Sequence, residues 1–142
     1  MIEVREARDA AEVNAALALR EAIFCGEQGV SLADERDGRD AEAVHLVVVE
    51  DGPVIATCRL LVEETTVKLG RMAVARSARG RGLARALLDE ADARARKLGA
   101  TRIALAAQLS ARQLYERAGY EPYGDVFLDA GIEHVMMAKA LS

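Results

Sequence analysis

The chain has 142 residues, of which 51% are hydrophobic and 30% are charged, and its formal net charge at pH 7 is −4. This length suits a single domain over residues 1–142, and the acidic balance argues against a general nucleic-acid-binding protein. The two cysteines and two histidines lack metal-ligand spacing, and no secretory signal pattern or long apolar run is present, so we expect a cytoplasmic protein without a metal or a membrane segment.

The first third of the chain predicts a strand and then a helix. The strand ends near Val4, and Asp9 with Glu12 three residues later is typical of a helix N-terminus. One stripe of this helix carries Val13, Leu17, Arg20 and Phe24. A polar, acidic segment follows over residues 27–42.

Three strands are predicted next, over residues 44–49, 54–61 and 66–74. Asp51-Gly52 between the first two is typical of a hairpin turn. Gly70 inside the third strand indicates a bulge or a close backbone approach. Cys58 lies on an alternating strand and is expected in the core.

The second half alternates helices and strands. The periodicity predicts a helix over residues 83–98 whose apolar face includes Leu98, with Gly99 as its C-terminal stop, and a buried strand over residues 103–107. Ser110 with Gln113 predicts the capped start of a short helix ending before Gly119. Strands over residues 120–127 and 134–141 complete a mixed α/β (α+β) fold, with a mostly antiparallel central sheet and helices on both faces.

Positive charge is concentrated in one segment of this acidic protein. No acidic residue occurs between Thr65 and Leu88, where six basic residues fall: Lys68, Arg71, Arg76, Arg79, Arg81 and Arg85. The Gly-rich run 79–84 opens the second long helix, and backbone N–H groups at such a helix N-terminus favour a phosphate. The alternative is an ordinary Gly-rich helix start with solvated arginines. The run lacks the Gly-Lys-Ser/Thr of a Walker loop and the third glycine of a dinucleotide fingerprint.

These residues resemble the GNAT N-acetyltransferase superfamily. Arg79-Gly80-Arg81-Gly82-Leu83-Ala84 resembles its Arg/Gln-x-x-Gly-x-Gly/Ala motif, and residues 69–74 resemble its bulged fourth strand. The run 114–120 resembles its Tyr-Glu signature, with Tyr120 in place of the usual Phe. Residues 23–30, His45, 107–108 and 131–134 resemble the ElaA-type branch.

The resemblance implies a site for acetyl-CoA, with no metal, in a cleft between splayed strands near residues 68–74 and 101–107. Met72, Ala73 and Val74 would offer backbone groups to the pantetheine arm. The loop Arg79, Gly80, Arg81, Gly82, Leu83 and Ala84 would wrap the pyrophosphate, with Gln108 beside the cofactor. Tyr115 matches the family tyrosine that acts as general acid on the departing thiolate; a core aromatic is the alternative.

The acceptor site is less defined. A lysine-like amine with a pKa near 10.4 must lose a proton to a base or a water chain, and the candidates are Glu27, Asp37, His45 and His134. For both histidines a hydrogen-bonded structural role is favoured, and for Glu27 an internal ion pair with Arg20.

Other charged residues have two interpretations. Arg20, Glu27, Arg71 and His134 are assigned to the acceptor side. Arg59 and Arg71 bind an anionic group of the acceptor or pair with the acids of residues 27–42. Those acids attract a cationic amine or, as is commoner, form a solvated loop.

The main functional hypothesis is acetyl transfer from acetyl-CoA to a primary amine of a small molecule or peptide. A non-catalytic acyl-CoA-binding regulatory module is an alternative, which Tyr115 opposes only weakly. Acyl-homoserine-lactone synthases are another, because their front half resembles Arg20, Phe24, Glu35, Asp37, Asp40 and Arg59; they are generally longer and have tryptophan, which this chain lacks. The sequence leaves three points open: the identity of the acceptor, the length of the transferred acyl group, and whether the last strands form a homodimer.

Overall fold

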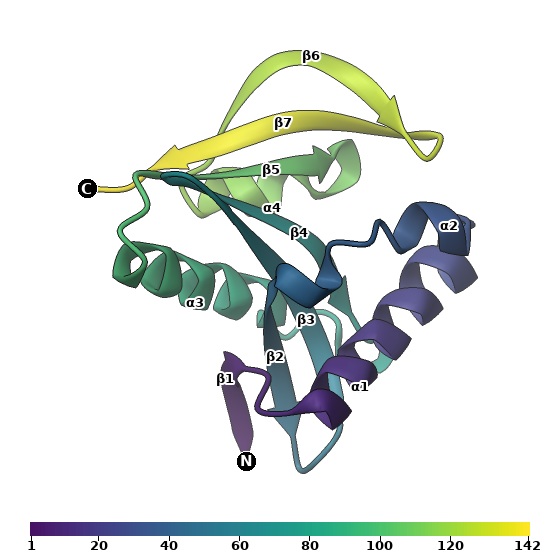
Figure 1. The fold of residues 1–142 in the computed structure, drawn as a ribbon. Helices are drawn as coiled ribbons and strands as arrows, with labels where there is room; N and C mark the ends of the chain where they lie inside the picture. The colour runs from purple at the N-terminus through teal and green to yellow at the C-terminus, as the bar shows by residue number, and fades with distance from the viewer.

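The computed structural model describes residues 1–142 and arranges seven strands in one sheet (Figure 1). The elements in chain order are β1 (Ile2–Glu6), α1 (Ala10–Arg20), α2 (Leu32–Glu35), β2 (Val44–Glu50), β3 (Val54–Glu63), β4 (Thr66–Val74), α3 (Leu83–Lys97), β5 (Arg102–Gln108), α4 (Arg112–Arg117), β6 (Glu121–Asp129) and β7 (Ile132–Ala140). A π-helical segment, Glu21–Glu27, continues α1, and short 3₁₀ turns precede β2, α3 and α4.

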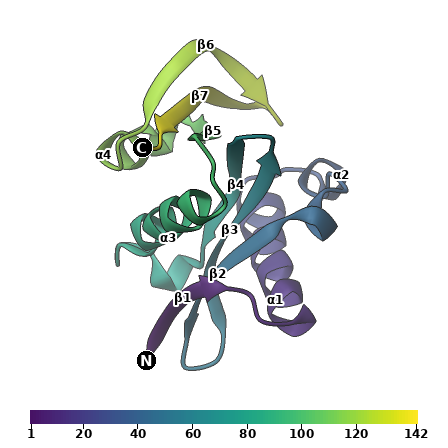
Figure 2. The ribbon, with the colours of Figure 1, turned by 60° about the vertical axis from the view of Figure 1, so that its left-hand side comes forward.

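The sheet is mixed, as expected from the sequence. Its strand order is β1-β2-β3-β4-β5-β7-β6, and every pair is antiparallel except β4 and β5, which run parallel on either side of the α3 crossover. Helix α1 lies against one face of β2, β3 and β4, and α3 lies against the other (Figure 2). The predicted fold class, with helices on both faces, is confirmed.

Strand β2 is covered on both faces, which explains its continuous apolar run. Leu46 and Val48 point into the large core under α3, while Val47 and Val49 form a smaller cluster with Ala16 of α1. Successive side chains of a strand point to opposite faces of the sheet. Because both faces of β2 are covered, the residues at both alternating sets of positions must be apolar.

Strands β4 and β5 separate half-way along their length. Their parallel pairing covers only Thr66–Leu69 against Arg102–Leu105. At that point β4 carries one extra residue relative to β3, because Thr57 pairs with Ala73 but Arg59 pairs with Gly70. The bulge expected at Gly70 is confirmed, but the residue with the left-handed backbone is Arg71 (φ 54°). A non-glycine residue in this region costs about 1–2 kcal/mol.

Most predictions that rest on residues close together in the sequence are confirmed. Asp9 accepts a hydrogen bond from the Glu12 backbone N–H at 2.9 Å and caps α1. Asp51 and Gly52 both have positive φ in the β2–β3 hairpin, and Gly99 has φ 77° just after α3. Cys58 is buried in the core, as expected.

Two local predictions are wrong. The Ser110 side chain does not cap α4, because a 3₁₀ turn precedes that helix and the Arg112 N–H donates to the Leu109 carbonyl instead. Leu98 lies just beyond the last residue of α3 and is 49% exposed, so it does not belong to the helix's buried face. No helix in the structure has the length and apolarity needed to cross a membrane.

Candidate active site

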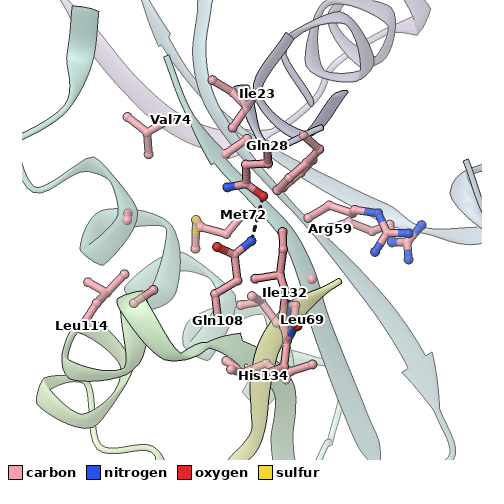
Figure 3. A pocket seen from close by; sticks show the side chains of 18 of the residues that line it. Ile23, Gln28, Arg59, Leu69, Met72, Val74, Gln108, Leu114, Ile132 and His134 are labelled. Carbon is pink, nitrogen blue, oxygen red and sulfur yellow. Dashed lines mark hydrogen bonds between the residues drawn. The ribbon is translucent and has the colours of Figure 1, made fainter. Parts of the chain in front are cut away.

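A cavity of about 800 Å³ opens where β4 and β5 diverge. Its walls come from the π-helical segment, the loop before α3, helix α4 and strand β7, so residues from both halves of the chain face one space (Figure 3). The cavity therefore lies at the cleft between these strands that the family resemblance implied. Of the sequence-predicted site residues, those that line it are Glu27, Asp37, Arg59, Arg71, Met72, Ala73, Val74, Arg79, Gly80, Gly82, Leu83, Ala84, Gln108, Tyr115 and His134.

One end of the cavity is suited to an anion. Gly80 and Gly82 have φ of 79° and 77°, which glycine adopts without strain, and a Cβ at either position would meet nothing within 4 Å. The space above the loop is thus open. The first turn of α3 contains no acidic residue, and its N–H groups have no helical partners. Together with Arg79 and Arg85, which also line the cavity, this end favours a phosphate.

The arginines of this loop have different partners. The Arg79 Nη2 donates to both carboxylate oxygens of Glu27, at 2.8 and 3.0 Å, and its Nε donates to the Val74 carbonyl at 3.2 Å. Arg81 instead pairs with Glu50 at 2.6 Å and does not line the cavity. The Arg81 side chain is therefore outside the space that the rest of the loop faces.

The middle of the cavity is bounded by β4 and by an amide bridge. Met72, Ala73 and Val74 follow the last residue of β4 that pairs with β5, so this strand edge is open toward the cavity. The Gln108 side-chain Nε2, at the end of β5, donates to the side-chain Oε1 of Gln28 at 2.9 Å (Figure 3). In the sequence, Gln28 belongs to the run 23–30 that resembles the ElaA-type branch, and no spacing indicates its contact with Gln108.

Tyr115 lies on α4 and is 6% exposed. Burial raises the pKa of its phenol to about 12, with a smaller contribution from Cys58, so the hydroxyl stays protonated at neutral pH. Tyr120 packs edge-on against it, with ring centroids 6.1 Å apart. Unlike Tyr115, Tyr120 does not line the cavity.

His134 lies on the far wall, at the start of β7. Its Nδ1 is 2.7 Å from the Ile132 carbonyl oxygen, and its ring stacks on Phe127. Because a carbonyl only accepts, Nδ1 carries the hydrogen, which in the neutral ring leaves a lone pair on Nε2. His134 lines the cavity, and such a nitrogen is able to accept a proton.

Two candidates for the acceptor side of the reaction lie outside the cavity. His45 is buried on β2, where its Nε2 contacts the Asp40 carbonyl oxygen at 2.9 Å, and it does not line the cavity. The expected Arg20–Glu27 ion pair is wrong. Arg20 is wholly buried outside the cavity, and Glu27 pairs with Arg79, because the wider π-helical turns after Arg20 move Glu27 off the stripe of an α-helix.

Arg20 belongs to a charged cluster under one end of the cavity, formed by Arg20, Glu35, Arg36, Asp37, Asp40, Arg59 and Arg71. We call it the arginine–carboxylate cluster. It corrects the expectation of a solvated acidic loop, since Glu35 is only 2% exposed and bonds Arg20 at 2.6 Å. The Arg59 guanidinium holds the pKa of Asp37 far below its ordinary value. The sequence singled out most of these residues, but not that they form one cluster.

A model described as an acetyltransferase (GNAT) domain matches residues 24–141. The chain belongs to the GNAT acetyltransferase family. A UPF0039 protein of Mycobacterium tuberculosis is 36% identical over 138 residues, covering 92% of this GNAT chain and 86% of the relative. The expected resemblance to this superfamily is confirmed, and membership identifies the protein as an acyltransferase.

Solved structures agree with this assignment over the whole GNAT domain. An acyl-CoA N-acyltransferase from Pseudomonas aeruginosa is 30% identical and superposes with a TM-score of 0.86, covering 99% of each chain. Escherichia coli ElaA is 25% identical with a TM-score of 0.87, covering 98% of this chain and 99% of its own. The cavity therefore lies in a fold that the chain shares with these two solved structures over nearly their whole length.

Proposed function

We propose that this GNAT protein is a cytoplasmic enzyme that transfers an acetyl group from acetyl-CoA to a primary amine. The observation that carries the proposal is the placement of Tyr115, the open β4 edge and the Gly80–Gly82 loop around one cavity. One end of that cavity suits a phosphate and the middle offers backbone groups, in the order that a pyrophosphate followed by a pantetheine arm requires. A structural relative is named as an acyl-CoA N-acyltransferase, which supports the donor class.

The residues present fit acetyl-CoA. The N–H groups at the start of α3, with Arg79 and Arg85, would hold the pyrophosphate and its neighbouring phosphate. The free edge of Met72, Ala73 and Val74 would hydrogen-bond the pantetheine amides as an added strand does. Bound acetyl-CoA supplies an activated thioester carbonyl.

Two side chains would handle protons in the reaction. The Tyr115 hydroxyl, whose pKa burial raises to about 12, is a donor for the sulfur that leaves. On the acceptor side, His134 Nε2 would accept the proton of the attacking amine. Glu27 also lines the cavity, but both of its oxygens are engaged by Arg79. Asp37 is covered by Arg59, and His45 lies outside the cavity.

The first experiment is a thermal-shift comparison of the purified protein with acetyl-CoA, CoA, ATP and S-adenosylmethionine. A ligand that binds only the folded state raises the melting temperature. We expect stabilisation by acetyl-CoA and CoA alone, followed by release of free thiol when amines are added. Stabilisation by S-adenosylmethionine with no response to CoA would overturn the proposal in favour of a lactone synthase. Binding of acetyl-CoA without transfer to any amine would favour a regulatory module.

A further inference from the structure

The arginine–carboxylate cluster leaves its carboxylates fully used. Arg20 and Arg36 donate to the two oxygens of Glu35, at 2.6 and 2.7 Å. Both oxygens of Asp40 accept from Arg20, at 2.7 and 3.2 Å. Both oxygens of Asp37 accept from Arg59, at 2.8 and 2.7 Å. Every carboxylate oxygen of Glu35, Asp37 and Asp40 thus already accepts a hydrogen bond from an arginine.

The unused hydrogen-bonding groups of the cluster are donors. Arg59 lines the cavity, is 5% exposed, and its Nε is buried without a partner. Arg71 also lines the cavity; its Nε and Nη2 bond mainly to the Glu35 carbonyl, and its Nη1 donates to no protein atom. Arg71 Nη1 is therefore the donor available to a molecule in the cavity, and an acceptor oxygen with a negative charge would form a charge-assisted hydrogen bond with it. Arg59 Nε is buried too deeply for such a contact, but the positive charge of Arg59 favours an anion at this wall.

Within the cluster, the positive charge of Arg71 is the one least closely paired with a carboxylate. Its carboxylate contacts are long, at 3.4 Å to Asp37 and 3.7 Å to Glu35. Burial and the neighbouring charge of Arg59 lower its pKa, so an added negative charge would be favourable there. Its left-handed backbone turns the residue at the bulge, immediately before the Met72–Val74 edge. Asp34 and Asp129 line the cavity too, but both residues are exposed to solvent.

We infer that the amine acceptor carries a carboxylate, which Arg71 binds with Arg59 behind it, so that the substrate is a small amino acid rather than a simple amine. The inference rests on the proposed function and narrows it. The carboxylate would lie beside the bulge of β4, next to the strand edge proposed for the pantetheine arm. The amine of a short amino acid would then point into the cavity that His134 also lines.

The test is a competition assay. Amino acids are mixed at equal concentrations with their carboxamides and their decarboxylated amines, and acetyl-CoA is added. The acetylated products are then quantified by mass spectrometry. We expect kcat/KM for the carboxylates to exceed that of the matched amides by roughly 10- to 100-fold, since a hydrogen bond to a charged group is involved.

Arg71→Gly is the decisive variant, because glycine accepts the left-handed backbone and β4 keeps its bulge. We expect the preference for carboxylates over amides to fall toward one, through a raised KM, while acetyl-CoA stabilises the variant as it does the parent. Arg71→Lys should retain part of the preference, since it keeps the charge but loses the planar fork. Arg8→Gln, a substitution of an exposed arginine outside the cavity, should retain all of it.

Several results would overturn the inference. Equal acetylation of amides and carboxylates by the parent would do so, as would an unchanged preference in Arg71→Gly. Binding of acetyl-CoA without acetylation of any amino acid in the mixture would contradict the inference that the acceptor carries a carboxylate, but not the proposed acetyl-CoA site. A protein that does not respond to CoA contradicts the proposed function itself, and the inference with it.

Discussion

Glu27 and Arg79 form an ion pair between the end of the π-helical segment and the loop before α3, with both carboxylate oxygens within 3.0 Å of one Arg79 nitrogen. The two residues are 52 positions apart in the chain. In the proposed complex the same guanidinium faces the pyrophosphate. The carboxylate of Glu27 therefore competes with the phosphates for this arginine.

We predict that Glu27→Gln tightens CoA binding by about two- to five-fold, because it removes a competing negative charge whose exposed ion pair contributes about 0–1 kcal/mol. The gain should be larger at low salt than at physiological salt, since exposed charges are screened. Titration calorimetry at two salt concentrations measures it. Glu50→Gln is the matched control, because it frees Arg81, which does not line the cavity. Weaker CoA binding in Glu27→Gln would contradict the competition.

Tyr115→Phe should lower the turnover number by roughly 100-fold, the scale of a lost general acid. The dissociation constant of acetyl-CoA should change little. Since the pKa of Tyr115 is raised to about 12, its deprotonation should cause no loss of rate between pH 7 and about 10. Steady-state kinetics with thiol detection and a pH profile check both statements.

Tyr120→Phe serves as the control for that variant. Tyr120 packs against Tyr115 but lies outside the cavity, and its hydroxyl is buried without a partner. Its removal should leave turnover unchanged and raise the melting temperature. Equal turnover in the parent and Tyr115→Phe would remove the general-acid role from Tyr115.

Gly82→Ala and Gly99→Ala form a second matched pair at the two ends of α3. Both glycines have φ 77°, so each alanine should lower the free energy of unfolding by about 1–2 kcal/mol. Only Gly82→Ala adds a methyl group at the proposed pyrophosphate site, and we expect it to weaken CoA binding roughly ten-fold (about 1.4 kcal/mol). Urea unfolding and calorimetry separate the two effects. Equal CoA affinity in both variants would place the phosphates elsewhere.

Glu35→Gln should lower the free energy of unfolding by about 1.5–3 kcal/mol, because the wholly buried Arg20 loses the charge of one carboxylate partner and keeps only Asp40. Glu42→Gln removes an exposed carboxylate that pairs with Arg39, and it should cost under about 1 kcal/mol. Denaturant unfolding compares the two variants. Similar losses would show that the arginine–carboxylate cluster does not stabilise the fold as its burial implies.

Local signals in the sequence predicted the fold well. The Asp9 cap, the Asp51-Gly52 turn and the strand Thr66–Val74 each depend on residues within a few positions, and the structure confirms them. The Gly80–Gly82 run predicted the open helix N-terminus for the same reason, since positive φ at glycine is a local property.

The partners of charged side chains could not be predicted in this way. Arg20 finds Glu35 and Asp40 at 15 and 20 positions away, and Arg79 finds Glu27 at 52. A helical wheel with 3.6 residues per turn paired Arg20 with Glu27, but the π-helical turns change that spacing. Such pairings depend on how the loop between Gln28 and Ala43 folds back over the sheet, which no short-range pattern encodes.

The sheet has two parts, β1–β4 and β5–β7, which pair with each other at one end only. Backbone pairing connects β1–β4 to β5, β7 and β6 only through the four residue pairs from Thr66–Arg102 to Leu69–Leu105. A ligand that contacts both parts at the open end stabilises the paired arrangement of β4 and β5 by its binding free energy. Amide hydrogens of β5 and β7 should therefore exchange with solvent more slowly when the cleft is filled, even at residues that the ligand never touches.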